Sequence, residues 1–271
     1  MPSIHPMAIV DPKAKIADDV EIGPFCTVGP NVEIGAGSKL VSHCSISGYT
    51  TIGENNQIFQ FVSLGSPPQD LEWLKEPSYL KIGSGNVFRE GFTANPGTKA
   101  DTSTVIGNDC FFMINSHIAH NCQIGNNVIL VNGALIGGYA ELGDKCLMSG
   151  NTAVHQFCKV GRLAMLGGGT PISKDLPPFM LCFSKTNTVS GINLIGMKRN
   201  GFSRDTIRAM KNVFKIFFRS RIMPKQAVAK VEADSSLFSI PEVQEFLDFV
   251  KNSKRGILGS HIDYLERSEK E

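Results

Sequence analysis

The chain has 271 residues, of which 42% are hydrophobic and 19% charged, so its composition is that of a folded globular protein rather than a disordered one. The sequence holds no run of 18 apolar residues and no N-terminal hydrophobic region of the signal-peptide kind, so we expect a cytoplasmic protein without a membrane-spanning helix. The net charge is +2, but residues 198–230 contain ten Lys and Arg against one acid, Asp205, which predicts an acidic body joined to a basic C-terminal element.

A six-residue period dominates the sequence from residue 10 to residue 172. Large apolar residues recur at every sixth position from Val10 to Leu64 and again from Ile106 to Ile172. A helix would give a period of 3.6 and a lone strand a period of 2, so neither explains the series. Glycine often follows the large residue, which predicts turns between very short strands. The residue four positions after each large one is small, as at Cys26 and Cys44.

This pattern resembles the hexapeptide-repeat family, in which three short strands per coil build a left-handed triangular prism. The resemblance alone implies the left hand, because crossovers between parallel strands are ordinarily right-handed. The expected fold is mainly β: a left-handed parallel β-helix followed by a small α-helical C-terminal domain. At about 4.8 Å per coil, residues 8–178 would form roughly nine coils. We expect the large residues to fill the corners of the prism and the small ones to line its flat interior.

Two insertions interrupt the period without disturbing its register. They span residues 65–81, which contain the only Trp, and residues 95–105. Loops that leave a repeat scaffold often have a function. The repeat ends after Pro177 and Pro178, so we divide the chain into a β-helix at residues 1–187 and a helical domain at residues 188–271.

The C-terminal domain is predicted to contain several short helices. Residues 191–202 form a helix closed by Gly201, and Ser203 is the expected N-cap of the next one. Pro224 and Pro241 each open a further helical stretch, and the polar tail from about Lys254 is expected to be mobile.

No spacing of cysteines or histidines predicts a metal or a cofactor. Six of the seven cysteines occupy the small interior register, all but Cys182, and none forms a Cys-x-x-Cys pair, so buried thiols acting as small apolar groups explain them. A zinc site like that of hexapeptide carbonic anhydrases needs three histidines. His117 and His120 lie three residues apart without a third partner.

His120 is the best candidate for a catalytic residue. It falls in neither the large nor the small register of the repeat, so its side chain is expected to project from the prism surface. Imidazole titrates near pH 6.5, which suits a general base that deprotonates a hydroxyl group at neutral pH. A solvated surface histidine is the plainer alternative. Against it, His117 and a polar insertion lie nearby in the repeat.

Six motifs occur in order along nearly the whole chain: PPQDL (67–71), FREGFT (88–93), INSHIAHNC (114–122), AVHQFCKVG (153–161), DLPP (175–178) and GINLIGMKRNGFS (191–203). Together they resemble the UDP-N-acetylglucosamine 3-O-acyltransferase family of lipid A biosynthesis. The resemblance implies transfer of an acyl or 3-hydroxyacyl chain from acyl carrier protein to the glucosamine 3-hydroxyl of UDP-N-acetylglucosamine.

The resemblance also implies a role for each matching residue. His120 would be the general base, and the amide of Gly138 would donate to the oxyanion. Asp70 would hold the sugar, His117 would be a second histidine of the site, and Gly168 would set the acyl length. The residues matching nucleotide contacts are His155, Gln156, Asn193 and Arg199.

The chain departs from better-known members of this family at several site positions. Asn121 replaces an acid beside the base, and Tyr139 replaces a histidine after Gly138. The other departures are Glu72 for Lys, Asn95 and Pro96 for His-Arg, and Ile195 and Asn200 for polar or basic residues. They leave two alternatives open: acylation of a variant UDP-sugar, such as a 3-amino sugar, or a solenoid that binds sugar nucleotide without catalysis. Acyl length and hydroxylation also stay open. The related N-acyltransferase has an additional N-terminal domain, for which a repeat that begins by Val10 leaves no room.

Two partners are expected besides the sugar nucleotide. A prism presents flat faces, so a pocket for sugar and acyl chain needs a second wall, and the family builds that wall from a neighbouring subunit; we expect a homotrimer. Arg204, Arg208, Lys211 and Lys215 are spaced to lie on one helical face, with no acid on that stripe, and should dock the acidic acyl carrier protein. A nucleic-acid role is not favoured, because no aromatic platforms accompany the basic residues.

Overall fold

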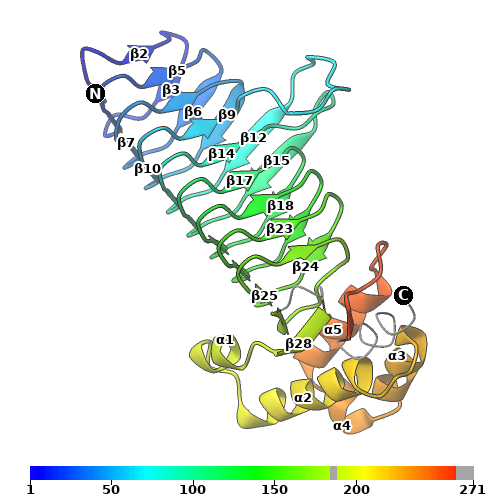
Figure 1. The fold of residues 1–271 in the computed structure, drawn as a ribbon. Helices are drawn as coiled ribbons and strands as arrows, with labels where there is room; N and C mark the ends of the chain where they lie inside the picture. The colour runs from blue at the N-terminus through cyan, green and yellow to red at the C-terminus, as the bar shows by residue number, and fades with distance from the viewer. Residues whose placement is uncertain (184–187, 261–271) are drawn as a thin grey trace.

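Three parallel sheets wind around one axis to form a three-sided column. The computed structural model describes residues 1–183 and 188–260 (Figure 1). As far as Ile172, successive strands pass from one sheet to the next, and each strand pairs in parallel with its equivalents in the neighbouring coils. The strand Thr188–Ile192 then pairs antiparallel with Met180–Cys182. The column is the left-handed parallel β-helix that the six-residue period and the resemblance predicted.

The strands of the described residues divide among the three sheets as follows. The first sheet contains β1 (Ser3–Ile4), β4 (Glu21–Ile22), β7 (Lys39–Leu40), β10 (Gln57–Ile58), β13 (Val87–Phe88), β16 (Phe111–Phe112), β19 (Ile129–Leu130), β22 (Leu147–Met148), β25 (Met165–Leu166), β27 (Met180–Cys182), β28 (Thr188–Ile192) and β29 (Gly259–Ser260). The second contains β2 (Ile9–Val10), β5 (Thr27–Val28), β8 (Ser45–Ile46), β11 (Ser63–Leu64), β14 (Thr93–Ala94), β17 (His117–Ile118), β20 (Leu135–Ile136), β23 (Ala153–Val154) and β26 (Pro171–Ile172). The third contains β3 (Lys15–Ile16), β6 (Val32–Ile34), β9 (Tyr49–Ile52), β12 (Tyr79–Ile82), β15 (Ser103–Ile106), β18 (Gln123–Ile124), β21 (Glu141–Leu142) and β24 (Lys159–Val160).

The large apolar residues lie in the strands and not at the corners, which corrects the expected filling of the prism. Ile22, for example, is the last residue of β4, whereas Cys26 follows the turn that leads to β5; both are buried. The physical reason is that the three flat sheets enclose the wide centre of the triangle. The small residues sit where two sheets converge beside a turn and little space remains.

Both insertions leave the column between the second and third sheets. The chain departs after Leu64 and returns at Tyr79, and it departs again after Ala94 and returns at Ser103. The excursions are therefore shorter than the expected 65–81 and 95–105, because β12 and β15 are four residues long and pair over their full length. The seven cysteines, including Cys182 in β27, are all buried.

Five helices follow the column in the described residues and cover its C-terminal end (Figure 1). Ser203 caps the second helix through Thr206 N–H, and Pro224 and Pro241 each begin a helix, as the sequence predicted. Asp234 caps a short helix that was not predicted. The helices are α1 (Leu194–Arg199), α2 (Arg204–Phe218), α3 (Pro224–Glu232), α4 (Ser235–Phe238) and α5 (Pro241–Lys251).

The segment after α5 returns to the column. Gly259 pairs with Thr188, Ile257 bridges Asp175, and Leu258 is buried. Ile257 and Leu258 of the expected mobile tail are thus packed against the fold, and residues 261–271 lie outside the described part of the chain. Within that described part, none of the helices is long and apolar enough to traverse a lipid bilayer.

Candidate active site

His120 lies at the turn that leads from β17 in the second sheet to β18 in the third. Its side chain is only 12% exposed, so it is more covered than the sequence suggested. Its Nδ1 atom is 3.1 Å from Asn121 Oδ1, and its Nε2 atom is 3.8 Å from Asp70 Oδ2. Asn121 adopts the left-handed conformation (φ 60°), which asparagine tolerates better than most residues. The turn therefore directs both ring nitrogens toward protein groups.

The first insertion brings Asp70 to the imidazole. Asp70 Oδ1 accepts a hydrogen bond from the backbone N–H of Glu72, which leaves Oδ2 facing His120. The base of this insertion is held by the Asn95 side chain, which donates to the carbonyl oxygens of Ser66 and Pro67. Asn95, one of the departures from the family pattern, thus anchors the loop that contains Asp70.

Gly138 lies directly against the His120 ring, one coil further along. A Cβ atom added to Gly138 would be 2.5 Å from His120 Cε1, so a side chain cannot be accommodated unless the ring moves. The next residue, Tyr139, donates its backbone N–H to the carbonyl oxygen of His120. Within residues 1–183 and 188–260 the N–H of Gly138 has no acceptor. A free N–H beside an imidazole can stabilise a developing oxyanion.

Two further histidines share the outer face of the second sheet. His117 Nδ1 is 2.7 Å from Thr93 Oγ1. Burial lowers the pKa of His117, and charge on His120 acts in the same direction, while the contact with Thr93 opposes both. A groove of about 340 Å³ runs over β17, β20, β23 and β26, and His117 and His155 line it together with apolar groups. Gln156 is exposed, and its carbonyl oxygen is 3.1 Å from His155 Nδ1.

The remaining predicted residues lie toward the helical end of the column. Asn193 caps α1 through Gly196 N–H and donates to the Leu163 carbonyl, and Arg199 is the exposed last residue of α1. Gly168 is exposed, and an added Cβ would lie 3.6 Å from the nearest atom, so there is room for a side chain. The structure thus gathers Asp70, His117, His120 and Gly138, and no hydrogen bond or ion pair among described residues links α1 to them.

The predicted basic stripe lies on α2. Arg204, Arg208, Lys211 and Lys215 are all exposed, and Ile207 and Met210 on the other face are buried. The expectation that no acid accompanies the stripe is wrong: Asp205 pairs with Arg208 at 2.9 Å, because residues three apart on a helix are neighbours. Both partners are more than three-quarters exposed, so the pair contributes little.

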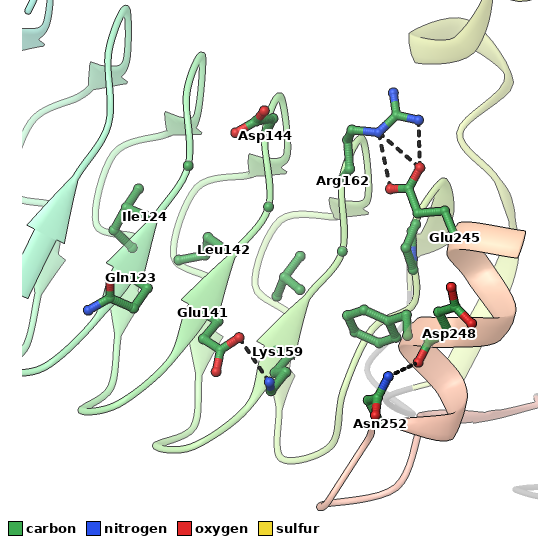
Figure 2. A pocket seen from close by; sticks show the side chains of 16 residues that line it. Gln123, Ile124, Glu141, Leu142, Asp144, Lys159, Arg162, Glu245, Asp248 and Asn252 are labelled. Atoms are coloured by element: carbon green, nitrogen blue, oxygen red, sulfur yellow. Dashed lines mark hydrogen bonds and ion pairs between the residues drawn. The ribbon is translucent and has the colours of Figure 1, made fainter. Parts of the chain in front are cut away.

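A second cavity, of about 610 Å³, lies away from the histidines. It lies between the third sheet and α5, as Figure 2 shows. Four of its six charged side chains form ion pairs: Glu141 with Lys159 at 2.9 Å and Arg162 with Glu245 at 2.7 Å. No histidine lines it. In the part of the chain that the structure describes, no three metal-ligating side chains cluster. We therefore place the chemistry at His120.

One site residue was missed from the sequence. Thr98, from the second insertion, donates its backbone N–H to Asn121 Oδ1 and is buried. The only available signal was its place in an insertion that leaves the coil next to that of the base, since nothing in the local sequence specifies a contact 23 residues away.

The stacked hexapeptide coils and the imidazole beside a free backbone N–H define a transferase of the hexapeptide class. Residues 13–48 and 103–138 match the bacterial transferase hexapeptide model, and residues 175–258 match the model for domain 2 of UDP-N-acetylglucosamine O-acyltransferase. A curated protein from Thermodesulfovibrio yellowstonii, named acyl-[acyl-carrier-protein]–UDP-N-acetylglucosamine O-acyltransferase, is 46% identical over 95% of this chain and 99% of its own length. The chain belongs to the UDP-N-acetylglucosamine O-acyltransferase family.

Solved structures of the family agree with this fold over most of the chain. That of the Acinetobacter baumannii protein LpxA has a TM-score of 0.91 and 41% identity, and covers 94% of this chain and 99% of its own. That of the Arabidopsis UDP-N-acetylglucosamine acyltransferase has a TM-score of 0.82 and 30% identity, with coverages of 94% and 99%.

Proposed function

We propose that this protein transfers an acyl or 3-hydroxyacyl chain from acyl carrier protein to the glucosamine 3-hydroxyl of UDP-N-acetylglucosamine, the first step of lipid A biosynthesis. One observation supports the chemistry above all others. His120, with Nε2 directed toward Asp70, lies against Gly138, whose N–H has no acceptor among the described residues. The names of the relatives supply the donor and the acceptor.

The residues around His120 can perform each step of such a transfer. Nε2 of His120 takes the proton of the 3-hydroxyl as its oxygen attacks the thioester carbonyl. The carbon–oxygen bond forms, and Gly138 N–H donates to the oxyanion of the tetrahedral intermediate. The carbon–sulfur bond then breaks, and the imidazolium returns the proton to the departing thiolate. Asp70, close to Nε2, can accept a hydrogen bond from the sugar and offset the charge on the imidazolium.

Mass spectrometry tests the proposal most directly. The purified protein is incubated with UDP-N-acetylglucosamine, its 3-amino analogue and a panel of acyl-carrier-protein thioesters. The expected product is UDP-N-acetylglucosamine heavier by one acyl group, formed by the wild type and not by His120→Gln. No product with any thioester, or equal turnover by His120→Gln, would refute the proposal.

Gly168 is proposed to keep the acyl groove open for a long chain. The space beside it supports this, because a Cβ atom added at Gly168 would meet its nearest neighbour at 3.6 Å, an ordinary contact. Each CH₂ group excluded from the groove removes about 0.8 kcal/mol of burial. Gly168→Met should therefore shift the preference toward shorter thioesters by orders of magnitude. An unchanged chain-length profile would mean that the acyl tail does not pass this residue.

A homotrimer with sites between subunits is proposed from the outer surface of the first sheet. The outward residues of its N-terminal strands are polar, as at Lys39 and Gln57, whereas those of its later strands are apolar and half-buried. The apolar series is Val87, Phe111, Ile129, Leu147 and Met165. A neighbour packed there would cover this stripe.

Sedimentation measures the oligomer directly. Wild type should sediment as a trimer, and the pair Ile129→Glu and Leu147→Glu as an inactive monomer, since charges would be buried in the interface. The control is Gln57→Glu, an outward position of the same sheet, which should remain trimeric. A fully active wild-type monomer would refute the trimer.

The stripe Arg204, Arg208, Lys211 and Lys215 is proposed as the docking face for acyl carrier protein. Exposed basic groups speed encounter with an acidic partner more than they add affinity. Lys211→Glu with Lys215→Glu should raise KM for the acyl-carrier thioester and spare KM for the UDP-sugar. Lys225→Glu with Lys230→Glu on α3 makes the same charge change elsewhere and should have little effect. Equal effects of the two pairs would refute a specific docking face.

A cytoplasmic location of the protein stays a prediction.

A further inference from the structure

The position of the proton on neutral His120 follows from the partners of Asn121. The backbone N–H of Thr98 donates to Asn121 Oδ1 over 3.0 Å, and the Thr98 hydroxyl donates to the same atom over 3.1 Å. A backbone N–H can only donate, so the amide atom that faces it is the oxygen. His120 Nδ1 is 3.1 Å from this same oxygen. Because oxygen only accepts, Nδ1 must hold the hydrogen, which leaves Nε2 with a free lone pair.

Tyr139 completes this network from the next coil. The Thr98 hydroxyl has one hydrogen, which it donates to Asn121 Oδ1. The Tyr139 hydroxyl, 3.2 Å from Thr98 Oγ1, therefore donates its own hydrogen to that oxygen. The Tyr139 ring stacks on Phe157 at 4.9 Å and meets the His120 ring edge-on at 5.4 Å. Thr98 and Asn121 are 6% and 9% exposed, so water competes little for these hydrogen bonds.

We propose that Thr98 and Tyr139 are positioning residues that act through Asn121 to hold His120 as its Nδ1–H tautomer. The Nε2 lone pair then faces Asp70 and the incoming sugar hydroxyl. This inference rests on the proposed role of His120 as general base. A free imidazole side chain favours the opposite tautomer, so the hydrogen bond to the other nitrogen decides which form is present. The network consists of uncharged groups, and it therefore orients the base without the charge that an acid in place of Asn121 would supply.

The tautomer of His120 can be determined by ¹⁵N NMR of the full-length protein with labelled histidines, which does not depend on enzymatic activity. At a pH where the imidazole is neutral, the His120 signals, assigned by their loss in His120→Gln, should show Nδ1 protonated. In Asn121→Ala they should move toward the Nε2–H pattern, while the signals of His5 and His43 stay in place. A wild-type His120 protonated at Nε2, or an Asn121→Ala variant that keeps Nδ1–H, would overturn the inference.

Kinetics then separate positioning from general packing. Tyr139→Phe keeps the ring stack and removes one hydrogen bond, so kcat should fall about fivefold with both KM values unchanged. Thr98→Val should lower kcat about tenfold, and Thr98→Ser should restore it. Unchanged kcat in both Tyr139→Phe and Thr98→Val would overturn the inference. A wild type that shows Nδ1–H and yet transfers no acyl group would contradict the proposed function and leave the tautomer assignment standing.

Discussion

Two histidines occupy comparable turns of the column and have different surroundings. His43 lies at the turn between β7 and β8, between the rings of Phe25 at 4.8 Å and Phe61 at 5.2 Å. It is exposed, and its side chain makes no hydrogen bond to any described residue. His120 also lies at a turn and beside an aromatic ring, yet it is 12% exposed and has partners at both ring nitrogens.

The difference arises from the insertions. The coils around His43 are regular, so its turn meets only the turns directly before and after it. The coils before His120 release two insertions, one bringing Asp70 to Nε2 and the other bringing Thr98 to Asn121. At His43 the regular coils leave the ring on the surface, whereas at His120 the two insertions cover the ring and supply its partners.

Replacement of the two histidines should give the largest contrast. His120→Gln removes the general base and should lower kcat/KM by about 10²–10⁴-fold. His43→Gln makes the same chemical change at an exposed turn and should leave activity unchanged. Steady-state kinetics of both variants measure this. Comparable losses would mean that histidine at either turn acts only through folding.

Two glycines test whether the His120 ring needs the space beside it. In Gly138→Ala the new methyl group would overlap the ring, so it should displace the base and lower kcat by about 100-fold, the effect of misplacing a catalytic group by roughly 1 Å. In Gly29→Ala the added Cβ would lie 3.6 Å from its neighbours, so activity and Tm should be retained. Full activity of Gly138→Ala would contradict the close packing of Gly138 against His120.

His117 should make the stability of the middle coils depend on pH. Its pKa is lowered by burial in the folded state, whereas the unfolded value is about 6.5. Just below pH 6.5 the His117 side chain binds a proton in the unfolded chain but not in the folded protein. The contribution of His117 to stability is therefore present above pH 6.5 and is lost as the pH falls. Urea unfolding of wild type and His117→Gln between pH 5 and 8 should show a shallower dependence in the variant. Parallel curves would refute the prediction.

The smallest expected effect is a difference in alkylation between two buried cysteines, Cys26 in the N-terminal coils and Cys122 beside His120. In the N-terminal coils, the nearby thiol of Cys44 lowers the pKa of Cys26. Burial raises that of Cys122 beside the site to about 12. All are buried, so the native protein should resist alkylation. At denaturant concentrations just below unfolding, Cys26 should be modified before Cys122, as read by peptide mass spectrometry. The reverse order would show that the pKa of the thiol does not determine which cysteine is labelled first.

The sequence alone determined the repeating part of this protein. A period of six sets the backbone of each coil through local preferences, and every coil then stacks on an equivalent one. The stacked coils and the burial of six of the seven cysteines could therefore be predicted, whereas the left hand came from the resemblance alone. The helix starts at Ser203, Pro224 and Pro241 were predictable for the same reason, since capping and proline geometry are local.

Only the tertiary structure decided how the exceptions to the repeat meet. The contact of Thr98 with Asn121, the approach of Asp70 to His120 and the return of Leu258 to the column join segments distant in sequence. The placement of the large apolar residues in the strands also depended on the tertiary structure, because the width of the prism arises only when the three sheets close around its axis. Such contacts arise from the paths of nonrepeating loops and from the space left between coils, and a period in the sequence constrains neither.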